Sequence, residues 1–213
     1  MGTLILSGGG SIEQNAETNR YFVESIDKDK PLLYIPLAGD PQYRSYESSL
    51  AYVQSMFLSL GIREITLWSD LENKTIEEVK QFSAIYFSGG YTLTLLKAIR
   101  KSGFDEVLTQ FYESGGTIYG QSAGAIIFGS NISHTLLKED TSFDYAPLNL
   151  LNHYRLWCHY DSTDDELICE LSKENDSPFI ALTEGGAICF SNSNVKVLSK
   201  TVYKFKDCKK KNI

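Results

Sequence analysis

The sequence has few residues of the kinds that build metal sites and disulfide frameworks. Its 213 residues include 4 cysteines and 3 histidines. The cysteines form no Cys-x-x-Cys pair and no regular framework spacing; they are Cys158, Cys169, Cys189 and Cys208. With the histidines scattered among them, we expect no metal site. Four free thiols suit a reducing compartment.

The chain also lacks the marks of exported, membrane and nucleic-acid-binding proteins. No apolar run approaches the roughly 18 residues of a membrane span. The chain passes almost directly from Met1 into the strand-like run Thr3–Ser7, which leaves no signal peptide. Its formal net charge is −7, whereas a nucleic-acid partner favours a basic face. We therefore predict a cytoplasmic protein with no membrane or nucleic-acid partner.

The composition of the chain indicates one globular α/β domain. Hydrophobic residues make up 42% and charged residues 22% of the chain, which is ordinary for a folded domain of this size. The last eight residues hold four lysines. We predict a single domain over residues 1–206 and a solvated basic tail over residues 207–213. Both a monomer and a homodimer are compatible with the sequence.

Strand-like and helical segments alternate over the first 130 residues. The expected strands are Thr3–Ser7, Leu32–Leu37, Ile62–Trp68, Ala84–Ser88 and Thr117–Tyr119. Such alternation is typical of a three-layer fold, in which a mostly parallel sheet has helices on both faces. Gly61 is expected to end one helix as its C-cap, and Thr75 with Glu78 has the spacing of a capping box.

The last third of the chain has a different pattern. One helix is expected over Asp164–Asn175, among short strands. Those strands are Arg155–His159, Phe179–Thr183, Ala187–Ser191, Val195–Ser199 and Val202–Phe205. We interpret them as a meander that completes the same domain.

The most informative stretch is Gly115–Gly129, which reads GGTIYGQSAGAIIFG. Thr117–Tyr119 has the composition of a buried strand, Gly120–Gly124 is a tight turn, and an apolar helix start follows. Strand, turn and helix form the setting in which G-x-S-x-G becomes a nucleophile elbow, with Ser122 at its tip. The flanking glycines would let the chain segments pass closely.

Other loops should meet Ser122 at the same place. In parallel sheets the functional site lies outside the carboxyl ends of the strands. Gly8–Gly10, Ala38–Pro41 and Gly89-Gly90 each follow an expected strand. Their convergence on this edge favours a catalytic Ser122 over a simple turn.

A nucleophilic serine needs a base and an orienting acid. His159 ends a strand-like run and is the preferred base, whereas His134 is expected on the surface. Glu184 ends the buried strand Phe179–Thr183 and is the preferred acid, since an unpaired carboxylate at an apolar strand end is costly. Asp161 is the alternative acid, although its position suits a helix N-terminus.

The order Ser122, His159, Glu184 disfavours an α/β-hydrolase, in which the acid precedes the histidine. An α/β-hydrolase order would require Glu139, Asp140 or Asp144 as the acid. For the oxyanion hole we expect the N–H groups of Ala123, directly after the nucleophile, and of Gly90 in a neighbouring exit loop.

These residues resemble the serine peptidase family of dipeptidase E (aspartyl dipeptidase) and cyanophycinase. The motifs are FSGGYT (Phe87–Thr92), GQSAGA (Gly120–Ala125), CHYD (Cys158–Asp161) and LTEGGA (Leu182–Ala187), in that order. The segment Ile35–Gly39 and the opening strand with its glycines are also similar, so the resemblance covers nearly the whole chain.

The resemblance implies a fold like that of class I glutamine amidotransferases, which is flavodoxin-like. It also implies hydrolysis of a small peptide substrate through an acyl-enzyme, with Ser122 as nucleophile, His159 as base and Glu184 as orienting acid. No metal or organic cofactor is expected.

The sequence departs from the family in two ways, both near the expected substrate-binding residues Gly89, Tyr91 and Asp161. Tyr91 stands where the family usually has Asn. The aspartyl dipeptidases bind acidic substrates through an arginine after the histidine, whereas no arginine follows Arg155 here. Residues 161–176 instead hold seven acids and one lysine. If this segment lines the pocket, it would repel an acidic substrate, which predicts a peptidase without strict aspartate specificity.

Two other functions remain open from the sequence. An esterase or amidase could use the same three residues on another acyl substrate. A non-catalytic binding module could keep the fold and the cleft. Cyanophycinase activity is less favoured, because its polymeric substrate is usually met by a longer chain.

Overall fold

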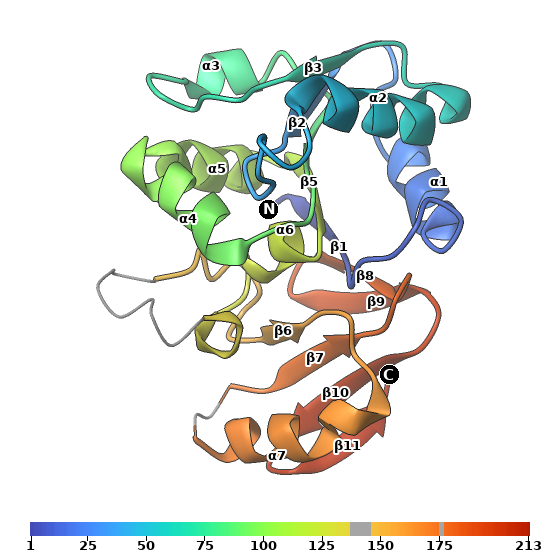
Figure 1. The fold of residues 1–213 in the computed structure, drawn as a ribbon, viewed down its shortest axis with the longest axis vertical. Helices are drawn as coiled ribbons and strands as arrows, with labels where there is room; N and C mark the ends of the chain where they lie inside the picture. The colour runs from blue at the N-terminus through green and yellow to red at the C-terminus, as the bar shows by residue number, and fades with distance from the viewer. Residues whose placement is uncertain (137–145, 175–176) are drawn as a thin grey trace.

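The computed structural model describes residues 1–136, 146–174 and 177–213. A seven-stranded sheet forms its centre, in the order β3-β2-β4-β5-β1-β8-β9 (Figure 1). The strands are β1 (Thr3–Ser7), β2 (Leu32–Ile35), β3 (Ile65–Leu67), β4 (Ala84–Phe87), β5 (Thr117–Gln121), β8 (Ala187–Ser191) and β9 (Asn194–Ser199). The first five are parallel, and the β8–β9 hairpin joins β1 antiparallel.

Helices cover both faces of this sheet (Figure 1). One side carries α1 (Ala16–Glu24), α2 (Tyr46–Phe57) and the 3-10 turn Leu58–Leu60. The other carries α3 (Ile76–Val79), α4 (Thr92–Lys101), α5 (Phe104–Glu113) and α6 (Ala123–Ile126).

The alternating side chains of the strands account for the two layers. Ile5 of β1 packs with Phe22 and Phe57 on the α1–α2 side, while Leu4 and Leu6 pack into the core beneath α4 and α5. Successive side chains of a strand point to opposite faces, so a strand buried on both sides is apolar throughout. The predicted three-layer α/β fold is confirmed.

Two local signals in the sequence have the predicted geometry. Gly61 has φ of 105° and ends the turn that follows α2, a left-handed conformation that glycine adopts without strain. At the start of α3, the Glu78 N–H donates to Thr75 Oγ1 at 3.3 Å, and the Thr75 N–H donates to Glu78 Oε2 at 2.8 Å. Both bonds of the capping box are therefore present.

The predicted meander is wrong, because the late strands divide between two sheets. A second sheet has the order β11-β10-β7-β6 and carries α7 (Asp165–Glu174). Its strands are β6 (Arg155–Trp157), β7 (Phe179–Leu182), β10 (Val202–Lys206) and β11 (Lys209–Asn212). In β7, Ile180 and Leu182 face the main core while Phe179 and Ala181 face α7. Burial on both faces makes this sheet a separate layer rather than one continuous meander.

The C-terminal segment is also not the fraying tail that the sequence suggested. Residues 209–212 are exposed, but they pair antiparallel with β10 as β11. Next to β11, Cys208 forms a disulfide with Cys169 of α7, with their Cα atoms 4.3 Å apart. The expectation of four free thiols is corrected, and Cys158 and Cys189 remain as buried free cysteines. The cysteines therefore give less support to a reducing compartment.

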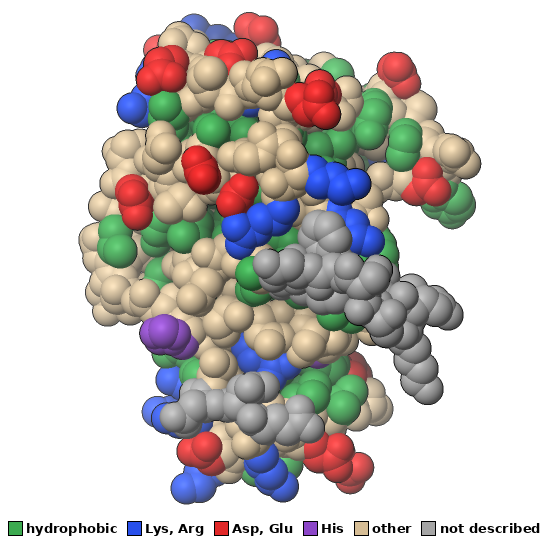
Figure 2. Space-filling model, turned by 90° about the vertical axis from the view of Figure 1, so that its left-hand side faces the viewer, with side chains coloured by type: hydrophobic (Ala, Val, Ile, Leu, Met, Phe, Trp, Pro, Cys, Tyr) green, Lys and Arg blue, Asp and Glu red, His purple; other side chains and the backbone are tan. Residues whose placement is uncertain are grey.

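The surface carries charges of both signs. Figure 2 shows Asp and Glu side chains interspersed with Lys and Arg over the face formed by α3, α4 and α5. Among the helices of the described ranges, none has the length and apolar character needed to cross a membrane. The short 3-10 helices Ser133–Thr135 and Ser162–Asp164 complete the fold.

We predict that Lys210→Ala destabilises the protein by about 1 kcal/mol, because Lys210 Nζ donates to Tyr160 Oη at 2.6 Å and to Asp165 Oδ2 at 2.9 Å. Lys211→Ala is the matched control, since neighbouring side chains of a strand point to opposite faces. Chemical denaturation measures both. Equal midpoints for the two variants would contradict a stabilising role of Lys210.

Candidate active site

Ser122 lies between β5 and α6 in an unusual backbone conformation. Its φ and ψ are 52° and −116°, a region that costs about 1–3 kcal/mol for a non-glycine residue and is concentrated at functional sites. A Cβ atom at Gly120 would lie 2.2 Å from Gly124 O, and one at Gly124 would lie 2.5 Å from Phe87 O. Both glycines are therefore required by close backbone approach, and the predicted elbow geometry is present.

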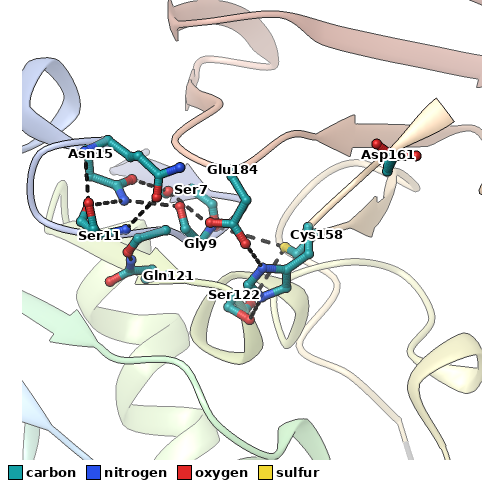
Figure 3. Close-up of polar contacts among 12 residues, drawn as sticks. Ser7, Gly9, Ser11, Asn15, Gln121, Ser122, Cys158, Asp161 and Glu184 are labelled. Atoms are coloured by element: carbon teal, nitrogen blue, oxygen red, sulfur yellow. Dashed lines mark hydrogen bonds and ion pairs between the residues drawn. The ribbon is translucent and has the colours of Figure 1, made fainter.

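Ser122, His159 and Glu184 lie in one hydrogen-bonded chain (Figure 3). Ser122 Oγ is 2.7 Å from His159 Nε2, and His159 Nδ1 is 2.5 Å from Glu184 Oε1. An ionised carboxylate only accepts, so Nδ1 carries the proton and Nε2 is left to accept the serine hydroxyl. The arrangement can activate Oγ as a nucleophile.

The second sheet supplies the two partners of Ser122. His159 follows β6 and Glu184 follows β7, and these strands are parallel neighbours. Their carboxyl ends therefore lie at one edge, which faces the elbow. The His159 and Glu184 side chains are 52% and 45% exposed, so the hydrogen-bonded chain is open to solvent.

Gly8–Gly10 forms the backbone surface that His159 and Glu184 contact, a role that sequence reasoning missed. A Cβ at Gly9 would lie 2.2 Å from His159 Cε1, and one at Gly10 would lie 2.7 Å from Glu184 Oε2. Backbone bonds also join the parts: the His159 N–H donates to Gly8 O at 2.9 Å, and the Gly185 N–H donates to Gly9 O at 2.8 Å. The sequence placed the glycines at this edge without indicating what they touch.

Buried polar side chains hold the glycine segment in place (Figure 3). Asn15 Nδ2 donates to Gly9 O at 3.0 Å, and Ser7 Oγ donates to Asn15 Oδ1 at 2.5 Å. Gln121 Nε2 donates to Gly10 O at 2.9 Å. Ser7 and Asn15 are 0% and 1% exposed. Nothing in the sequence pattern distinguished them from ordinary strand and helix residues.

A cavity of about 900 Å³ opens beside Ser122 and His159. Gly9, Ala38, Gly89, Gly90 and Tyr91 are among its lining residues, so the predicted convergence of loops on this edge is confirmed. The sequence-predicted substrate-binding residues Gly89 and Tyr91 both line it.

The residues of both expected oxyanion donors are close to Ser122: Ala123 follows it directly, and Gly90 belongs to the neighbouring glycine loop. A Cβ at Gly89 would lie 3.1 Å from Ser122 Cβ, so the glycine loop directly abuts the elbow. Within the described ranges, the N–H groups of Gly90 and Ala123 take part in no backbone hydrogen bond. They are available for a developing negative charge.

Asp161 lies apart from the other site residues (Figure 3) and outside this cavity, so its role in substrate binding stays a prediction without support from the cavity. It caps the turn Ser162–Asp164, where its Oδ1 accepts from the Thr163 N–H at 3.0 Å. That bond lowers the Asp161 pKa. None of the residues 161–173 lines the cavity.

The other acids and the cysteines do not extend the site. Glu139, Asp140 and Asp144, the acids required by an α/β-hydrolase order, lie outside the described residues. Cys158 is buried with Sγ 3.7 Å from Ser122 O, and burial raises its pKa well above the ordinary value, so the thiol stays neutral. Among the residues the structure describes, no cluster of His, Cys, Asp and Glu could hold a metal ion.

His134 is not the surface residue that its polar sequence context suggested. Its ring stacks on Trp157 with centroids 5.2 Å apart, and it meets Phe179 edge-on. Burial, aided by the nearby charge of Arg155, lowers its pKa to about 4. The residue is therefore neutral in the folded protein near pH 7.

Known proteins match this chain over most of its length. The model of Peptidase family S51 matches residues 3–198. An uncharacterized peptidase of Listeria monocytogenes is 25% identical over 145 residues, 66% of this chain and 70% of that protein. Peptidase E of Haemophilus influenzae is 25% identical over 178 residues, 78% of each chain. The crystal structure of a peptidase from an acI-B1 actinobacterium has a TM-score of 0.77 at 21% identity, covering 100% of this chain and 94% of that one.

We predict that stability falls as pH drops from about 6.5 to about 4, by on the order of 2–3 kcal/mol from His134 alone. In this window the unfolded chain binds a proton that the folded chain excludes. Denaturant titrations at several pH values should show a flatter pH dependence for His134→Gln. Equal slopes for the wild type and His134→Gln would refute the assignment.

Proposed function

We propose, because this chain belongs to peptidase family S51, that it is a serine peptidase that hydrolyses small peptides through an acyl-enzyme. The observation that carries this is the hydrogen-bonded chain from Ser122 Oγ through His159 to Glu184, with Ser122 held at a strained turn. Its members come from separate parts of the fold, and packing alone does not require them to meet.

The geometry suits a two-step reaction. As Ser122 Oγ attacks the scissile carbonyl carbon, His159 Nε2 takes the hydroxyl proton, and Glu184 stabilises the imidazolium that forms. The N–H groups of Ala123 and Gly90 would bind the oxyanion of the tetrahedral intermediate. Nε2 then protonates the leaving amine, and in the second step it accepts a proton from the water that hydrolyses the acyl-enzyme.

The size and lining of the cavity support a small-peptide substrate. Its volume of about 900 Å³ lies within the range of pockets that enclose most of a small molecule's surface. Five tyrosines contribute to its wall: Tyr34, Tyr43, Tyr52, Tyr86 and Tyr91. The expectation of a peptidase without strict aspartate specificity rests on the acid-rich segment 161–176. Its described residues 161–173 do not line the cavity, so the cavity wall does not support that part of the expectation.

We expect a fluorophosphonate probe to label the wild type at Ser122 and to leave Ser122→Ala unlabelled. The labelling rate should fall by about 10³-fold or more in His159→Ala, which removes the base, and by about 10²–10⁴-fold in Glu184→Gln. Mass spectrometry of the modified peptide identifies the site.

Ser88→Ala is the matched control, because Ser88 lines the same cavity but its hydroxyl pairs with Tyr34 rather than with a histidine. It should label at the wild-type rate. A folded wild type that resists the probe would sink the peptidase proposal and favour a non-catalytic module.

Gly9→Ala should lower peptidase kcat by about 10²-fold, since the added methyl would occupy the place of His159 Cε1 and shift the imidazole. Gly115→Ala is the control: it also has a positive φ, 100° against 115° for Gly9, but a Cβ there has nothing within 4 Å. Steady-state kinetics with circular dichroism as a folding check measures both. Similar kcat values for the two variants would argue against a role of Gly9 in positioning the His159 imidazole.

A further inference from the structure

We propose that Arg44 binds a carboxylate group of the peptide substrate and thereby orients the peptide in front of Ser122. The inference rests on the proposed peptidase function and adds a residue that determines specificity. Two groups of a peptide offer this chemistry, the C-terminal carboxylate and an acidic side chain.

Arg44 belongs to the loop between β2 and α2, which forms part of the cavity wall. The cavity is lined both by this loop and by Ser122 and His159. Among its described lining residues, Arg44 is the only lysine or arginine and Asp40 the only aspartate or glutamate. The strongest attraction for an anion inside the cavity therefore comes from one guanidinium.

The guanidinium is positioned but not neutralised. Its Cζ lies 4.7 Å from the centroid of the Tyr52 ring, and Nη2 donates to Ser48 O at 3.4 Å. Within the described ranges, Arg44 forms no ion pair. Stacking on an aromatic face leaves the in-plane N–H groups of an arginine open for a bidentate bond to a carboxylate.

Asp40 shapes the loop instead of pairing with Arg44. Its Oδ1 accepts from the Gln42 N–H at 2.8 Å, and its backbone oxygen accepts from the Arg44 N–H at 3.0 Å. These bonds close a turn that presents Arg44. Asp40 remains a negative charge in the same wall, which suits the ammonium group of a peptide better than its carboxylate.

The loop that carries Arg44 is tied to the glycine loop beside the nucleophile. The Tyr91 N–H donates to Ala38 O at 2.7 Å, and a Cβ at Gly90 would lie 2.2 Å from that same oxygen. Gly89 in turn contacts Ser122. The backbone of the loop that carries Arg44 is therefore held near the nucleophile through one intervening loop.

A contact between Arg44 and a substrate carboxylate would restrict the orientations in which the peptide binds. The chain from Ser122 to Glu184 is half-exposed, and the cavity is wide for a small peptide, so apolar contact alone leaves many bound orientations. One charge-assisted contact away from the reacting carbonyl fixes the peptide and raises the fraction bound in a reactive pose.

The test compares kcat/KM for matched peptides that differ by one carboxylate. Ala-Leu against Ala-Leu-amide reports the C-terminal group, and Asp-Leu-amide against Asn-Leu-amide reports the side chain. In Arg44→Gln, kcat/KM for the carboxylate member of one pair should fall about 10- to 100-fold, mainly through KM, with its neutral partner unchanged. The affected pair identifies which carboxylate is bound.

Arg63→Gln is the control for net charge, because Arg63 is 75% exposed, pairs with Asp29 and lies outside the cavity. It should keep the wild-type preference in both pairs. Fluorophosphonate labelling of Arg44→Gln should match the wild type, since the probe carries no carboxylate.

A binding measurement separates this inference from the proposed function. Calorimetric titration of Ser122→Ala, and of Ser122→Ala combined with Arg44→Gln, with the same peptides gives dissociation constants without any turnover. A 10- to 100-fold loss confined to a carboxylate peptide supports Arg44 even if the wild type hydrolyses nothing. A wild type without carboxylate preference, or an Arg44→Gln variant that weakens both members of each pair equally, would overturn the inference.

Discussion

The structure depends on a backbone junction between its two sheets. β1 of the main sheet runs into Gly8–Gly10, and this segment exchanges hydrogen bonds with the loops after β6 and β7: the Gly8 N–H donates to Gly186 O at 2.9 Å, and Gly8 O accepts from the His159 N–H at 2.9 Å. The elbow serine belongs to one sheet and its two partners belong to the other. Any shift of the sheets against each other would therefore separate the nucleophile from its base.

Glycine at this junction is a steric requirement. Side chains at Gly9 or Gly10 would occupy the space of the imidazole and the carboxylate, so the peptide backbone itself forms the surface on which His159 and Glu184 rest. The buried Ser7 and Asn15 fix that surface from behind. Their hydrogen bonds replace the packing that side chains would otherwise supply, and a satisfied buried network of this kind specifies one arrangement.

Much of the fold follows from local patterns in the sequence. The strand runs, the Gly61 terminus and the Thr75 capping box each depend on neighbouring residues, and all were predictable. The second sheet was not, because the partner of a short apolar strand such as β7 is decided by distant contacts. The pairing of Cys169 with Cys208 spans 39 residues and leaves no motif. The positions of Ser122, His159 and Glu184 were predictable from strand ends. The place of Asp161 outside the cavity was not, because its side chain caps the turn Ser162–Asp164 instead of following the strand end.

The strand β11 has a consequence for how the molecule behaves at high concentration. It is the outermost strand of its sheet, and such a strand offers unpaired N–H and C=O groups to any second chain, which invites fibrous stacking. Here that border carries the consecutive side chains Lys209, Lys210 and Lys211, and all are exposed. Because Lys210 is paired with Asp165, the charges of Lys209 and Lys211 are the ones that would repel a second such edge and disfavour edge-to-edge growth.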